Sequence, residues 1–218
     1  MTTRNIFLYF CLPIACLLLF AAKPAFNTGS EKVSFDQQLQ TFQKLGFVFN
    51  PGTDTSDLNR WGGHKRYEDQ PYNVMYMMLG SFTEREPHLP LTNKCWHLDR
   101  ELIKAKAGYT DLLHNLERIS NGELVLEKLK ESIDLQHGLS NINFEAKGKL
   151  FSWKLHVADG AFDSDFFSNL VELCQQTKTI RQFTILEMDG ENLVIGFENK
   201  DGLYAIRKAT GMHISWLN

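Results

Sequence analysis

Residues 142–157 read INFEAKGKLFSWKLHV, and their pattern is the clearest structural signal in the chain. Apolar and polar side chains alternate on both sides of the Lys147-Gly148 pair, which is typical of a turn. Alternation with a period of two places every second side chain on one face of a strand. The stretch therefore predicts an antiparallel hairpin with one buried face, and Trp153, which lies between Phe151 and Leu155 on that face, is expected in the core.

The sequence continues this plan to its C-terminus. The expected elements are a helix from Asp163 or Ser164 to Cys174, a second hairpin over 183–197 around Asp189-Gly190, a helix over 201–211 and a strand over 212–216. Asp-Gly is strongly favoured in two-residue hairpin turns, which join antiparallel strands. Residues 141–218 thus predict a ββαββαβ unit with a mostly antiparallel sheet and helices on one face.

Upstream of this unit, helical spacing dominates. Ser34 is a typical helix cap, and apolar residues follow it at helical intervals until Gly46. Further predicted helices cover 71–79, 109–119 and the segment of Leu126, Leu129 and Ile133, whereas 95–102 is expected to be extended. The sequence predicts one α+β domain over residues 34–218, with a helical N-terminal part.

The first residues indicate export. Ile6 to Ala22 is a run of seventeen residues without a charge, and Arg4 precedes it. Positive charge before such a run keeps the N-terminus in the cytoplasm and sends the following chain across the membrane. We expect residues 1–25 to be a signal peptide or a membrane anchor, and 26–33 to be a linker. If uncleaved, 6–22 would hold the protein in the membrane. We expect the domain outside the cytoplasm, in the bacterial cell envelope, either anchored in the membrane or secreted after cleavage.

Composition excludes some classes of partner. The chain has 218 residues, of which 43% are hydrophobic, and a net charge of −3. Residues 1–25 contain two cations and no acid, so the remainder carries 21 basic and 26 acidic side chains. Binding to nucleic acid needs clustered Lys and Arg, so we do not expect it. Outside the apolar run, the cysteines are Cys95 and Cys174, which either pair or pack as small apolar residues.

One group of residues has catalytic potential. Cys95, His97 and Asp99 fall at alternate positions of an expected strand and would share one face. Thiol, imidazole and carboxylate are the parts of a cysteine nucleophile with its base and orienting group. However, residues two apart in a strand lie about 6.6 Å from each other, which makes direct hydrogen bonds between them awkward. The sequence favours a structural role for all three.

Three other patterns are also better explained by structure than by binding. A transition metal needs three or four convergent ligands, and only folding could bring His64, His88 or His114 close to His97. The turn from Trp61 to Arg66 could present backbone N–H groups to an anion, but it lacks the flanks of a phosphate loop. Asp159, Asp163 and Asp165 do not have calcium-loop spacing and suit helix capping. We predict no metal and no cofactor.

A set of short motifs carries a resemblance. They are Phe35 with Leu45-Gly46-Phe47, Trp96-His97-Leu98-Asp99, Trp153-Lys154-Leu155 with Asp159 to Phe167, Arg181-Gln182-Phe183-Thr184, and Thr210-Gly211. Together they span most of 34–217, and the layout resembles a loose group of bacterial proteins of unknown function. Some bacterial proteins of this size are immunity proteins, which neutralise toxins. The resemblance implies no catalytic residue and no cofactor.

These observations leave three hypotheses. The first is a non-enzymatic protein-interaction domain of the cell envelope, immunity-like, that acts through an acidic surface with aromatic residues. The second is a hydrolase that uses Cys95 or His97 with partners supplied by the fold. The third is a small-ligand-binding domain with the Trp61 region at the mouth of a pocket. A deep pocket beside His97 would favour the enzyme, and an exposed face would favour partner binding.

Overall fold

The computed structural model describes residues 32–59, 63–99, 108–157, 163–188 and 192–218. In chain order, its elements are α1 (Phe35–Lys44), the 3-10 helix η1 (Thr55–Leu58), α2 (His64–Asp69), α3 (Asn73–Leu79), β1 (Cys95–Asp99), α5 (Thr110–Ile119), β2 (Glu127–Asp134), β3 (Leu139–Ala146), β4 (Lys149–His156), α6 (Asp165–Thr177), β5 (Gln182–Glu187), β6 (Asn192–Glu198), α7 (Lys200–Thr210) and β7 (Ser215–Trp216). The predicted α+β class is confirmed.

The strands form two antiparallel sheets in the described part of the chain. One sheet has the order β1-β6-β5-β7 and the other has the order β2-β3-β4. Both predicted hairpins are present, as β3–β4 and β5–β6. The expectation of one sheet is wrong, because each hairpin pairs with a different upstream strand: β3 pairs with β2, whereas β6 pairs with β1.

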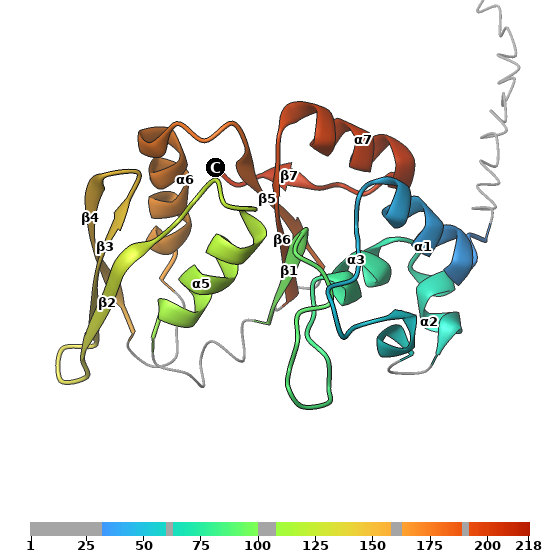
Figure 1. Cartoon of the computed structure of the whole chain (residues 1–218), viewed down its shortest axis with the longest axis horizontal. Helices are drawn as coiled ribbons and strands as arrows, with labels where there is room; N and C mark the ends of the chain where they lie inside the picture. The colour runs from blue at the N-terminus through green and yellow to red at the C-terminus, as the bar shows by residue number, and fades with distance from the viewer. Residues whose placement is uncertain (1–31, 60–62, 100–107, 158–162, 189–191) are drawn as a thin grey trace, which may run out of the picture. The chain divides into compact units, whose positions relative to one another are not determined.

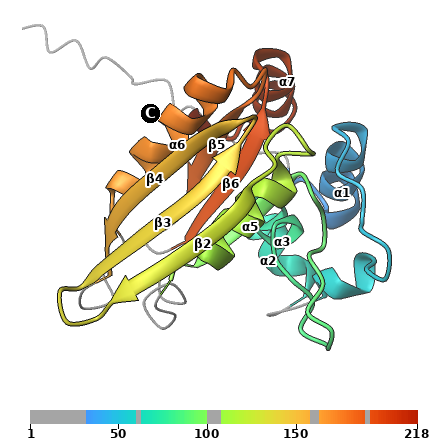
Figure 2. The same ribbon diagram turned by 60° about the vertical axis from the view of Figure 1, so that its left-hand side comes forward.

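Helices separate and cover the sheets. Helices α5 and α6 lie between the two sheets, and α1, α3 and α7 cover the other face of the four-stranded sheet (Figure 1). Along β6, Leu193 and Ile195 point toward α5 and α6, whereas Val194 points toward α1, α3 and α7. The predicted arrangement, with helices on one face of the sheet, therefore holds only for the three-stranded sheet. No described helix covers the outer face of that sheet (Figure 2).

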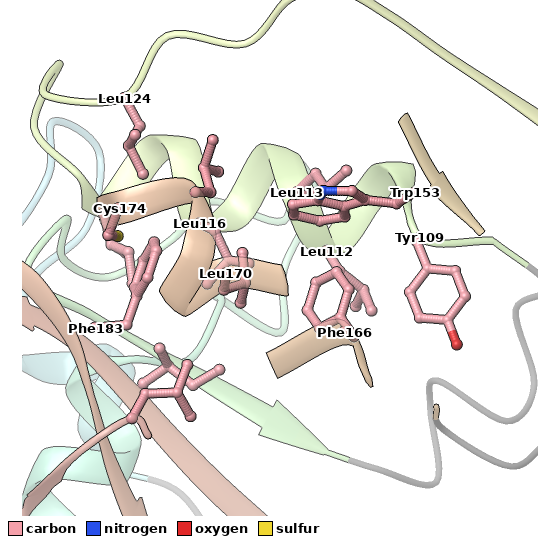
Figure 3. Packing of buried hydrophobic residues seen from close by; sticks show 14 of the residues in the cluster. Tyr109, Leu112, Leu113, Leu116, Leu124, Trp153, Phe166, Leu170, Cys174 and Phe183 are labelled. Atoms are coloured by element: carbon pink, nitrogen blue, oxygen red, sulfur yellow. The ribbon is translucent and has the colours of Figure 1, made fainter. Parts of the chain in front are cut away.

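The core between the sheets is built around aromatic side chains. Trp153 projects from β4 toward α5 and α6, and Phe166 lies below it (Figure 3). The two ring centroids are 6.0 Å apart at an interplanar angle of 89°, an edge-to-face arrangement that aromatic pairs favour. Only 7% of Trp153 is exposed, so its predicted burial is confirmed.

Strand β2 contradicts the predicted helix around Leu126, Leu129 and Ile133. The strand has a bulge between Glu127 and Lys130, and Lys128 adopts a φ of 54°. The bulge shifts the register, which hides the alternation of a strand. In addition, Glu131 takes the inward position after Leu129, where an apolar residue would have indicated a strand. The helix-like spacing of Leu126, Leu129 and Ile133 is therefore explained by a bulge in β2, which is an edge strand of its sheet.

Smaller differences concern the ends of elements. Ser34 forms the expected capping box with Gln37, and Asn199 caps α7 instead of the expected Asp201. Helix α2 replaces part of the turn predicted from Trp61 to Arg66. The Asp189-Gly190 turn, Trp61, Gly62, Asp159 and the predicted leader lie outside the described residues.

Candidate functional site

The side chain of Cys95 is completely buried in the protein. It lies on β1 facing α3, where its Sγ is 3.5 Å from the backbone oxygen of Tyr76, and its exposed fraction is 0%. Burial raises the pKa of Cys95 to about 12, since a thiolate loses its hydration there. At neutral pH the group is a thiol with no access to solvent, which does not favour it as a nucleophile. Cys174 is also buried and free, so the two cysteines do not pair in this structure.

His97 points to the same face of β1 as Cys95, but its hydrogen-bond partners come from distant segments. Its Nδ1 lies 3.2 Å from Ser81 Oγ, after α3, and its Nε2 lies 2.8 Å from Asn192 Oδ1, on β6. Both ring nitrogens are thus engaged in holding α3, β1 and β6 together.

The serine beside His97 has a structural setting. Ser81 is buried, its Oγ is also 3.0 Å from Met77 O, and its backbone N–H donates to Met78 O. The hydroxyl therefore helps to end helix α3. Asp99, the third residue of the predicted group, pairs in register with Asn192 at the end of β1. Sequence reasoning could not find Ser81 or Asn192, because no local spacing links them to His97.

The other predicted sites also have structural contacts. The ring of His64 stacks on Phe35, with centroids 4.0 Å apart, and its Nε2 lies 3.1 Å from Asn59 Oδ1. Asp163 accepts hydrogen bonds from the backbone N–H groups of His156 and Asp165, at 2.7 and 2.9 Å. Across the described ranges, no three His, Cys, Asp or Glu side chains converge as metal ligands would.

The uncovered side of the three-stranded sheet is different in kind. We call it the open sheet face; from β2, β3 and β4 it comprises Lys130, Ser132, Asp134, Leu139, Asn141, Asn143, Glu145, Leu150, Ser152, Lys154 and His156. The alternating residues of the same strands point to the inner face, where they are buried; they include Phe144, Phe151 and Trp153. Leu150 is 83% exposed and is the large apolar side chain that this face presents to solvent from β4.

The charges of this face are unevenly paired. Glu145 accepts a hydrogen bond from Lys128 at 2.7 Å, and Asp134 lies 2.7 Å from His137 Nδ1. Among the described residues, no carboxylate forms an ion pair with Lys130 or Lys154. The face therefore presents two lysines that have no ion-pair partner among the described residues, on a domain whose overall charge is negative.

A groove of about 370 Å³ runs over one end of the open sheet face. It is lined by Lys128, Lys130, Asn143, Leu150 and Ser152 together with two aromatic residues, Phe144 and Phe151. Such a groove offers cations, an amide, a hydroxyl and an exposed apolar side chain. It could hold a polypeptide segment that carries acidic and apolar residues.

Two further observations bear on the remaining hypotheses. None of the helices in the described ranges combines the length and apolar character needed to span a bilayer. Comparison of the chain with known protein families, with curated proteins and with solved structures finds no match.

Proposed function

We propose that this chain is a non-enzymatic protein-interaction domain of the bacterial cell envelope. Its N-terminal segment carries it out of the cytoplasm, and the open sheet face binds a partner protein. Neutralisation of a toxin is one activity of this class, and it is motivated by the resemblance to a loose group of bacterial proteins of unknown function, whose size some immunity proteins share.

The observation that carries the proposal is the contrast between the two sheets. The four-stranded sheet packs against apolar side chains on both of its faces. The three-stranded sheet does so on one face only, and its other face, the open sheet face, is exposed to solvent. A solvated face is ordinary for an antiparallel sheet. What favours binding at this face is its combination of the 83%-exposed Leu150 with two lysines that have no ion-pair partner among the described residues, since protein interfaces combine an apolar centre with a polar rim.

The chemistry of the face indicates its partner. Lys130 and Lys154 favour a partner surface that carries carboxylates, and Leu150, nearer the β3–β4 turn than either lysine, favours an apolar side chain beside them. The Asn and Ser side chains at the centre add hydrogen-bonding groups. We therefore expect an acidic protein surface with at least one apolar anchor.

The hydrolase hypothesis finds less support. Cys95 has no access to substrate, and the ring nitrogens of His97 are both occupied by structural partners. The small-ligand hypothesis depends on Trp61, which lies outside the described residues.

Reversal of the two free charges tests the proposal. The full-length protein, solubilised in mild detergent, serves as bait for the detergent extract of its own cell envelope. We expect Lys130→Glu/Lys154→Glu to reduce the amount of co-purifying partner by at least tenfold, because like charges then face the carboxylates of the partner. Quantitative mass spectrometry measures the ratio between variant and wild type.

A matched variant controls for charge alone. Lys65→Glu/Lys200→Glu makes the same charge change at exposed positions of α2 and α7, away from the open sheet face. It should retain the partner at the wild-type level. Equal retention by all three proteins, or equal loss in both variants, would contradict the open sheet face as the binding site.

A further inference from the structure

Strand β4 ends the three-stranded sheet with an unpaired edge. It pairs with β3 on one side, and no described strand pairs with it on the other. An exposed edge presents backbone N–H and C=O groups that can pair with another chain.

The hydrogen bonds at the end of β4 show which groups face this edge. The N–H of Val157 donates to Gly138 O, on the β3 side, at 2.9 Å. The N–H of His156 points the other way, to Asp163 Oδ2, and its C=O accepts from the Tyr109 hydroxyl at 2.7 Å. In an antiparallel strand, both backbone groups of a residue point to the same side, and the side alternates along the chain.

Leu150, Ser152 and Lys154 share the direction of His156. Their N–H and C=O groups therefore point away from β3, and none of the described residues forms a hydrogen bond with these six groups. Among the described residues, the edge is capped at His156. Between Leu150 and Lys154, no described residue pairs with it, and the length is sufficient for one short strand.

A groove follows the open part of this edge. It has a volume of about 200 Å³ and lies between residues 150–153 of β4 and the side chains of Asn169, Glu172, Leu173 and Gln176 on α6. At one end, Lys149 Nζ donates to Gln176 O at 2.6 Å, which holds the hairpin against the helix. At the other end lies the capped His156. The groove is therefore bounded along the strand and open to solvent at its side.

We infer that an extended segment of the partner protein adds to the sheet along the β4 edge between Leu150 and Lys154. This inference rests on the proposed function and specifies how the partner binds. Main-chain hydrogen bonds to the three outward residues supply the common part of the recognition. The side chains of the added strand alternate between the open sheet face and the α6 side.

The lining of the groove specifies the segment. On the open sheet face, its residues lie beside Leu150 and Lys154, which favours an apolar and an acidic side chain at positions four apart. On the α6 side they meet Asn169, Glu172 and Gln176, which favours polar or basic side chains. The occupant is thus an amphipathic extended segment of another protein.

Proline at position 152 tests the pairing directly. Ser152→Pro removes one outward N–H and places a ring at the edge, while the bonds between β3 and β4 run through Phe151 and Trp153. With envelope extract as the probe, we expect capture of the partner to fall at least tenfold. Ser152→Thr, which keeps both the N–H and the hydroxyl and suits a strand, should capture it at the wild-type level.

A second pair of variants covers the case in which Ser152→Pro fails to fold. Glu172→Trp fills the groove from the exposed side of α6 and should also reduce capture tenfold, whereas Gln175→Trp, on the same helix but outside the groove, should not. Cross-linking from position 154 should join the captured protein through a segment of the expected chemistry.

The outcomes separate this inference from the proposed function. Loss of capture in the charge-reversal variant, with full capture by Ser152→Pro and Glu172→Trp, would overturn strand addition and leave the open sheet face as the site. No capture by wild type, or capture that no variant changes, would overturn both. A dimer in light scattering that Ser152→Pro dissociates would show that a second copy occupies the edge, and would overturn the partner segment.

Discussion

At the scale of single residues, Cys95 and His97 show how far a local pattern reaches. Their alternate spacing on a strand was predictable, and β1 confirms it. Their partners were not predictable, because Tyr76, Ser81 and Asn192 belong to other elements that meet β1 only in the folded chain. Chemistry that depends on long-range contacts leaves no signal in a five-residue motif.

The environment of Cys95 leads to a prediction of low reactivity. Because the pKa of its thiol is raised to about 12, we expect no modification of the native protein by a thiol reagent between pH 5 and 9, and labelling only after unfolding. Mass spectrometry of the labelled residue measures this, and Cys95→Ser controls for other sites. Rapid labelling of the native protein, with an apparent pKa below about 8.5, would restore the hydrolase hypothesis.

At the scale of elements, hairpins with clear alternation were predictable from sequence, whereas β2 was not. Residues 142–157 carry their own periodicity, so the hairpin is determined locally. Strand β2 contains a bulge and an inward carboxylate, that of Glu131. The bulge is defined by pairing with β3, and the carboxylate has its hydrogen-bond donors at the start of α5, so neither feature can be inferred from the local sequence. The division into two sheets was unpredictable for the same reason, because it depends on long-range pairing: β3 pairs with β2, whereas β6 pairs with β1.

Glu131 explains why β2 carries a charge on its inward side. Its carboxylate accepts hydrogen bonds from the backbone N–H groups of Tyr109 and Thr110, at 2.9 and 3.1 Å, and from two hydroxyls, those of Thr110 and Ser140. Helix α5 has no side-chain cap of its own, so Glu131 provides the cap from a neighbouring strand. A negative charge at a helix N-terminus is favourable.

We expect Glu131→Gln to destabilise the protein by about 1–3 kcal/mol at pH 7, because an amide group then faces donors that need an acceptor. Burial alone would raise the pKa of Glu131, but the hydrogen bonds from Ser140, Thr110 and Tyr109 outweigh burial and lower it. A lowered pKa means that the stabilisation is present above the unfolded pKa of about 4.3 and is lost as the pH falls through the folded value.

Denaturant unfolding from pH 7 down to pH 3 measures the effect. The difference in free energy of unfolding between wild type and Glu131→Gln should be largest at pH 7 and should shrink below about pH 4. Glu127→Gln, an exposed carboxylate on the same strand, is the control and should change the free energy little. A difference that is constant over this pH range would show that the charge of Glu131 is not what stabilises α5.

At the scale of the whole molecule, location and binding mode depend on each other. A partner met outside the cytoplasm can only be bound there if the chain is exported. The apolar run of seventeen residues from Ile6 to Ala22 would be about 26 Å long as a helix, close to the thickness of a bilayer core of about 30 Å. Arg4 before the run favours the orientation in which the following chain would leave the cytoplasm.

We therefore expect residues 1–30, fused to a reporter enzyme that is active only outside the cytoplasm, to give full reporter activity. Leu12→Arg/Leu18→Arg should abolish the signal, because each charge near the centre of the segment costs about 2.5–3.5 kcal/mol on insertion. Thr28→Asn changes a polar residue outside the run without adding a charge, and should leave the activity unchanged. A silent wild-type fusion at normal expression would place the domain in the cytoplasm, and the partner would then have to be sought there.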